Sequence, residues 1–329
     1  MSSGKHRSKE LAAPVIGFSI SRERSDLLAR GIGPERLHDL LARLARAILR
    51  RGANVAYGGN WEQKEDNFTF DLLRVAGAER RVAERKIGRL YNHSSWPDYL
   101  TITSKIEAQW SDCCTVVRVK QQNAGFSGRG IVPDGDFRAE DARSRFNGAV
   151  TLSAMRRRMM QETRIRRPGV AQPERIPPVV ARILIGGKLD DYSGFVPGIF
   201  EEALVTLERR RPLYILGGFG GAAKVLADLI LAEGRNRPEE FTLAWHKKRN
   251  AYFANLLAAA GKFSKPAGFR SSKDLLEKLF GFVQKGRKNL SGTLQTGLDD
   301  GETRQLLQTR NVGTATRLVL KGLQAQRKL

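Results

Sequence analysis

Residues able to bind an anion or to carry acid–base chemistry are concentrated between Ile183 and Ile230. In this stretch two apolar runs end in glycine pairs, Gly186-Gly187 and Gly217-Gly218, and a helical pattern follows each run. Glycine after a strand lets backbone N–H groups approach an oxyanion, and a helix that begins there adds partial positive charge. The stretch therefore predicts two neighbouring loops that face an anionic group such as a phosphate.

An acidic pair, Glu201-Glu202, lies between these two runs, just after Pro197-Gly198. A carboxylate at the mouth of a pocket could polarise a water or stabilise positive charge on a ribose C1′ atom. Carboxylates in the first turn of a helix also stabilise its dipole, by roughly 0.3–1 kcal/mol, without any other role. Spacing alone leaves both interpretations open.

The run Arg156–Arg158 is flanked by Met155, Met159 and Met160. On a helix we expect the methionines to face the core and two of the arginines to face solvent. One arginine could hold a phosphate through the two parallel hydrogen bonds of its guanidinium group.

Two further strand patterns end in small residues. "PVIGFSIS" ends at Ser19 and Ser21, and "NVAYGG" ends at Gly58 and Gly59. Short apolar strands that alternate with helices predict a Rossmann-like α/β fold, with a parallel sheet covered by helices on both faces. Ligands of such sheets bind beyond the carboxyl ends of the strands. The predicted ligand-binding residues are Ser19, Ser21, Gly58, Gly59, Gly186, Gly187, Pro197, Gly198, Gly217, Gly218, Gly220 and Gly221.

The sequence does not support the common cofactor and metal sites. It has neither the dinucleotide fingerprint G-x-G-x-x-G with its acidic residue nor the phosphate loop G-x-x-x-x-G-K-[ST]. Its two cysteines, Cys113 and Cys114, are adjacent, and its four histidines are scattered. We therefore expect no metal site, no disulfide framework and no bound cofactor.

Charge and hydropathy set the range of partners. With 57 Lys+Arg against 34 Asp+Glu, the formal net charge of +23 attracts anionic small molecules and nucleic acids alike. Arginine is spread over almost every predicted helix and no nucleic-acid recognition motif is visible, so nucleic-acid binding stays a weaker alternative. No apolar run approaches the roughly 18 residues of a membrane span. We expect a cytoplasmic protein with no membrane partner.

The chain divides into three predicted parts. Residues 1–13 form a basic, flexible arm, residues 14–235 form the α/β nucleotide-binding domain, and residues 236–329 form a mostly helical C-terminal extension. An arginine- and proline-rich linker, Arg164–Pro178, lies inside the second part. If the protein bound a nucleic acid, we would expect this linker and the Lys-rich C-terminal region to contact it.

These segments, in this order, resemble the SLOG superfamily (the Smf/DprA–LOG group). In its LOG branch a helix with a Met-x-x-Arg pattern precedes a strand, and a P-G-G-x-G-T-x-x-E loop opens the next helix. Here Met155-x-x-Arg158 precedes the strand "ARILIGG" and the loop "PGIFEE". The chain is closest to prokaryotic SLOG branches that occur with anti-phage conflict systems, alongside TIR-type effector domains.

The resemblance implies a nucleotide-derived ligand, homo-oligomers and an effector protein partner. LOG enzymes are phosphoribohydrolases, which release a base from a nucleoside 5′-monophosphate. By that resemblance Arg158 would hold the phosphate or ribose, and Glu202, supported by Glu201, would assist cleavage of the N-glycosidic bond. The sequence departs from the LOG pattern in three places: Ile199 replaces a threonine, "KLDDYSGFV" separates Gly186-Gly187 from Pro197-Gly198, and Met159 replaces a lysine.

A changed loop favours a different ligand, or binding without turnover. We therefore expect a sensor or ligand-binding protein of a bacterial defence or conflict system, with a nucleotide N-glycosidic hydrolase as the alternative.

Overall fold

The structure is a computed structural model that describes residues 13–21, 31, 33, 35–62, 67–82, 88–166, 172–287 and 289–329. All but the last residue of the predicted basic arm lie outside this part of the chain.

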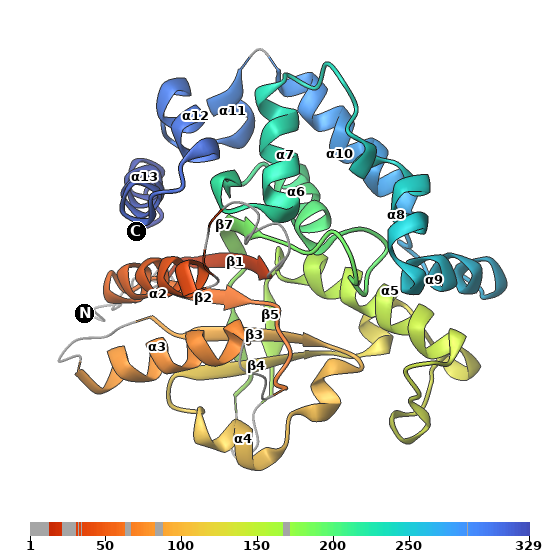
Figure 1. Ribbon diagram of the computed structural model, residues 1–329. Helices are drawn as coiled ribbons and strands as arrows, with labels where there is room; N and C mark the ends of the chain where they lie inside the picture. The colour runs from red at the N-terminus through yellow and green to blue at the C-terminus, as the bar shows by residue number, and fades with distance from the viewer. Residues whose placement is uncertain are drawn as a thin grey trace, which may run out of the picture.

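A six-stranded parallel sheet forms the centre of the molecule (Figure 1). Its order is β4-β3-β2-β1-β7-β8. The bounds are Val15–Ser21 for β1, Asn54–Tyr57 for β2, Leu90–Ser95 for β3, Cys114–Val119 for β4, Val179–Gly186 for β7 and Leu213–Leu216 for β8. A separate antiparallel pair, β5 (Thr163–Ile165) and β6 (Glu174–Ile176), overlaps the predicted linker.

The connectivity produces a switch point at β1. The chain builds outward from β1 to β4, then returns to place β7 on the other side of β1. In the register of this pair Gly17 lies opposite Arg182, and Ser21 lies opposite Gly186. Loops leave β1 and β7 at the same edge, and ligands of open α/β sheets bind in the crevice that opens at such a point.

Helices cover both faces of the sheet. Alternate residues of β1 explain why: Ile16, Phe18 and Ile20 join one core cluster, whereas Val15 joins another. The first cluster includes α2 (Glu35–Arg50) and α3 (Phe68–Val82). The opposite face is covered by α5 (Ala142–Arg158), α6 (Gly198–Glu208) and α7 (Gly221–Leu231). The Rossmann-like prediction is confirmed.

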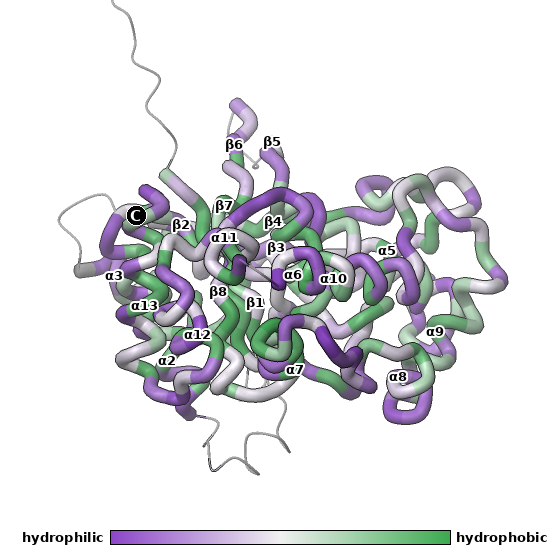
Figure 2. The backbone as a smooth tube through the Cα atoms, turned by 90° about the horizontal axis from the view of Figure 1, so that it is seen from above, coloured by the Kyte–Doolittle hydropathy of each residue, from purple (hydrophilic) through white to green (hydrophobic). Residues whose placement is uncertain are grey.

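The C-terminal region is helical, as predicted. The helices are α8 (Leu243–Arg249), α9 (Ala251–Lys262), α10 (Ser272–Gly286), α11 (Leu290–Leu294), α12 (Asp300–Gln308) and α13 (Val312–Ala325); a short α4 (Ser104–Gln109) lies earlier in the chain. The C-terminal helices pack on the α/β layers: α13 contacts α2, α10 contacts α6, and α9 contacts α5. Figure 2 shows the hydrophobic segments of β1 and β8 in the middle of the molecule. The helices therefore share the cores of the sheet domain, while the division near residue 235 stays a prediction.

Candidate functional site

The ends of β1 and β7 bring three predicted residues together. The N–H of Gly187 donates to the carbonyl of Ser21 at 2.7 Å, and the N–H of Lys188 donates to the Ser21 hydroxyl at 3.0 Å. Gly186 and Gly187 have φ angles of 62° and 103°, in the left-handed region that favours glycine. The loop after β7 is thereby fixed against the end of β1.

The junction after β2 borders the same edge. A Cβ on Gly58 would lie 2.7 Å from Met155 Cε of α5. The carbonyl of Gly59 accepts a hydrogen bond from Asn92 Nδ2 at 3.2 Å. Both glycines therefore allow close approach between the β2 loop and its neighbours.

The glycines after β8 make backbone contacts. A Cβ on Gly218 would lie 2.1 Å from the carbonyl oxygen of Thr309, and one on Gly217 would lie 2.6 Å from that of Leu307. Gly220 is the N-cap of α7, and the N–H of Ala222 donates to the carbonyl of Gly187 at 3.0 Å. The two glycine-ended junctions are neighbours, as their sequence suggests. Gly217 and Gly218 have no side chain and so allow the end of α12 to pack closely against them, and Gly221 lies against Gly186 and Gly187. A role of these glycines in ligand binding stays a prediction.

The first turn of α6 carries a buried ion pair. Pro197 is the N-cap, and a Cβ on Gly198 would lie 2.8 Å from Arg156 Nη2. Arg156 Nη1 donates to Glu201 Oε2, and these side chains are only 9% and 1% exposed. Glu201 therefore does more than stabilise the helix dipole, because it compensates a buried arginine.

A second buried ion pair lies beside the first. Arg182 points from the middle of β7 and is fully buried; its Nη1 lies 3.3 Å from Glu202 Oε1 and donates to Ser19 Oγ at 3.0 Å. Burial lowers the pKa of the Arg182 guanidinium, and the charge of Glu202 opposes that change. The pair joins β1, β7 and α6 at the switch point of the sheet.

Several polar atoms in this region have no hydrogen-bond partner among the described residues. They are Nε of Arg156, Nε of Arg182, Oε1 of Glu201 and Nδ1 of His93. Burial lowers the pKa of His93 to about 3, and the nearby charges of Arg182 and Arg158 contribute, so this imidazole is neutral. Buried polar atoms are normally paired, so each unpaired one calls for an explanation.

Asp98 adds a third carboxyl group near this cluster. It follows β3 in a short 3₁₀ helix (Asp98–Thr101), is partly buried, and its Oδ2 lies 3.4 Å from Ser95 Oγ. Burial raises the pKa of Asp98 to about 6, against the opposing effects of Ser95 and Arg156. A carboxyl group with this pKa can exchange a proton near neutral pH.

Arg158, the arginine selected from the sequence, lines a pocket that lies outside the buried cluster, and Arg157 lines the same pocket. Its charge nevertheless reaches His93, so it lies between that pocket and the buried cluster. The methionines face the core as predicted: Met155, Met159 and Met160 are buried. Of the three arginines, Arg156 is buried, whereas Arg157 and Arg158 are partly exposed, so two of the three reach solvent in part. A role of Arg158 in catalysis or binding stays a prediction.

Sequence reasoning named Arg156 only as a member of the arginine run, and it missed Arg182, His93 and Asp98. Only Arg182 left a clear signal, since it is a lone charge within the apolar strand sequence "VVARILIG". A charged side chain on a central strand is almost never fully buried unless it is paired.

Two other properties follow from the described part of the chain. It contains no group of three or more His, Cys, Asp or Glu side chains that could hold a metal ion. None of its helices combines the length and the apolar character needed to cross a membrane.

The strand order and the buried cluster at the switch point define an α/β protein of the Rossmann-like type. The chain belongs to the SLOG cluster2 family, whose model matches residues 10–167 and 176–306. No curated protein was found to match the chain. Membership of this family confirms the resemblance to the SLOG superfamily and is consistent with a nucleotide-related ligand.

Proposed function

We propose that this protein binds a nucleotide or nucleotide-derived anion at the carboxyl ends of β1 and β7, as the ligand-sensing component of a bacterial defence or conflict system. One observation carries the proposal. Two arginine–glutamate pairs, Arg156–Glu201 and Arg182–Glu202, are buried at the switch point and leave polar atoms without partners.

The cost of such a cluster favours a functional role. Burying charged groups costs several kcal/mol per ion unless hydrogen bonds satisfy them, and apolar side chains of similar volume often give equal or greater stability. A polar ligand in contact with the cluster would satisfy the unpaired atoms of Arg156, Arg182 and Glu201. The family match supports a nucleotide-related ligand as the occupant.

The state of the two glutamates favours binding over turnover. One oxygen of each carboxylate is engaged by an arginine and both side chains are buried, so a sugar carbon or a water reaches them only after a rearrangement. A homo-oligomer and an effector partner, to which the bound state would be passed, are part of the same proposal.

Hydrolysis of an N-glycosidic bond is the alternative, and Asp98 is the observation that favours it. Glycosidic cleavage uses one carboxyl group that can donate a proton and one that stays ionised. Asp98, whose pKa is raised to about 6, could fill the first role, and Glu202 could fill the second.

The experiment is mass spectrometry of a nucleotide panel after incubation with the purified protein and ultrafiltration. The panel contains nucleoside monophosphates, NAD, ADP-ribose and cyclic nucleotides. Depletion of one nucleotide without product supports the sensor. A free base or ribose phosphate, absent with Glu202→Gln and present with the exposed control Glu140→Gln, establishes the hydrolase instead.

If no nucleotide is depleted or converted, the proposal fails. Nucleic-acid binding, driven by the net charge of +23, would then be tested. In that case affinity should fall steeply with salt and should not depend on Glu202.

A further inference from the structure

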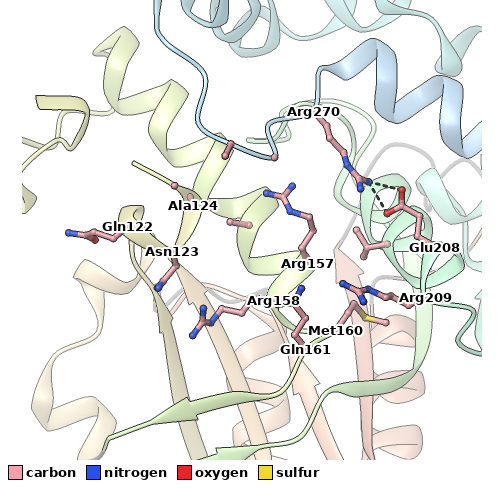
Figure 3. A pocket seen from close by; sticks show the side chains of 15 residues that line it. Gln122, Asn123, Ala124, Arg157, Arg158, Met160, Gln161, Glu208, Arg209 and Arg270 are labelled. Carbon is pink, nitrogen blue, oxygen red and sulfur yellow. Dashed lines mark hydrogen bonds and ion pairs between the residues drawn. The ribbon is translucent and has the colours of Figure 1, made fainter. Parts of the chain in front are cut away.

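A polar pocket of about 380 Å³ lies between α5, the end of α6 and the segment before α10. Figure 3 shows the side chains of Arg157, Arg158, Arg209 and Arg270 around this pocket. Glu208 is the one carboxylate among the described residues that line it. No residue of the buried cluster at the strand ends lines this pocket, so the two regions are distinct.

The positive charge of the pocket is only partly compensated. Arg270 Nη1 donates to both carboxylate oxygens of Glu208, at 2.7 and 2.8 Å. The guanidinium groups of Arg157, Arg158 and Arg209 have no ion-pair partner within the described residues, and Nε of Arg158 is buried without a hydrogen bond. Three arginines therefore face one pocket in which none of them has an ion-pair partner within 4 Å among the described residues.

The guanidinium group of Arg157 lies in a partly dehydrated environment with further positive charge nearby. Burial lowers the pKa of its guanidinium group; Glu201 and Glu208 oppose the change, whereas the charge of Arg270 adds to it. Like charges held close together in a partly dehydrated site repel each other, and an anion bound between them offsets that repulsion by attracting both.

The other lining residues indicate which part of a ligand is recognised. Amide side chains are supplied by Gln122, Asn123 and Gln161, and no aromatic residue occurs among the described lining residues. A guanidinium group can donate two parallel hydrogen bonds to two oxygens of one phosphate. Proteins that recognise a base commonly stack it on an aromatic side chain. The volume lies in the range of small-molecule sites.

We propose that this pocket is a second binding site, for a small molecule that carries two or more phosphate groups. Arg157, Arg158 and Arg209 bind the phosphates, and the amides of Asn123 and Gln161 supply further donors. The site does not rest on the proposed function, because none of its residues belongs to the Arg156–Glu201 and Arg182–Glu202 pairs.

The test is isothermal titration of the full chain with sodium tripolyphosphate at constant ionic strength. The variant is Arg157→Gln with Arg209→Gln. The matched control is Arg36→Gln with Arg310→Gln, which removes the same charge from exposed positions. We expect saturable binding by the wild type, at least a tenfold weaker affinity for the variant, and less than a twofold change for the control.

Two results would overturn the proposal: no saturable binding by the wild type, or equal loss of affinity in variant and control, which would mean attraction by net charge alone. Arg209→Gln by itself keeps the test valid if the double variant does not fold, since Arg209 is exposed. Its affinity should fall at least threefold, and an unchanged affinity would contradict the assignment of Arg209.

Discussion

Replacing Arg182 by methionine should destabilise the protein strongly through the glutamate that it leaves behind. Arg182 is fully buried, and the Glu202 side chain, which is 10% exposed, has no other ion-pair partner among the described residues. Methionine fills a similar volume, and its neighbours Met159 and Met160 already form an apolar contact surface. The main effect of Arg182→Met is therefore an unpaired buried carboxylate.

The expected magnitude follows from that description. Removing one partner of a buried pair typically costs about 3–5 kcal/mol, and the lost hydrogen bond to Ser19 adds about 1 kcal/mol. With a urea m-value of about 2 kcal/mol per molar, the unfolding midpoint should fall by about 2–3 M. Such a loss is a large part of the roughly 5–15 kcal/mol that stabilise a typical domain.

The assay is urea unfolding followed by circular dichroism, extended to a double-mutant cycle. Arg182→Met with Glu202→Leu removes both charges, so the double variant should regain most of the stability that the single variant loses. The reasoning is refuted if Arg182→Met costs less than about 1 kcal/mol, or if the double variant is no more stable than the single one.

Three further predictions concern other parts of the molecule. Burial lowers the pKa of His246 from 6.5 in the unfolded state to about 4 in the folded state. As the pH drops from 6.5 to 4, the unfolded state therefore takes up a proton first, and the free energy of unfolding falls by about 3 kcal/mol in total. His246→Phe should reduce that slope in unfolding experiments across this range, and an unchanged slope would contradict the assignment. Burial raises the pKa of Asp98 from 3.8 to about 6, so its contribution to stability is present below pH 3.8 and lost as the pH rises through 6. Asp98→Asn should therefore stabilise the protein above pH 6, by up to about 3 kcal/mol, with little effect at low pH; melting temperatures at both ends of the range will show whether the difference has this sign. Gly218→Ala should destabilise by about 1–3 kcal/mol, because the new Cβ meets the backbone of Thr309. The control Gly261→Ala has open space and should be neutral or slightly stabilising, so equal denaturation midpoints for the two variants would argue against the close contact.

The sequence alone was sufficient to predict the class of fold, whereas the position of the site at the carboxyl edge of the sheet stays a prediction. The spacing of Leu37, Leu40, Leu41 and Leu44 is that of one face of a helix, and in the structure these side chains belong to α2 and are fully buried. Glycine pairs after apolar runs marked the ends of β2 and β7 correctly, because local backbone conformation restricts which residues can occupy such turns.

Tertiary structure alone decided which charges meet. Successive residues of a helix point about 100° apart, so the rotation of α5 against the sheet determines which of Arg156–Arg158 faces Glu201. The contact between Arg182 and Ser19 joins residues 163 positions apart, and it exists because the crossover places β7 beside β1. Neither relation leaves a local pattern. The sequence therefore determined the elements and their small-residue junctions, whereas packing between distant elements determined the buried ion pairs of the site.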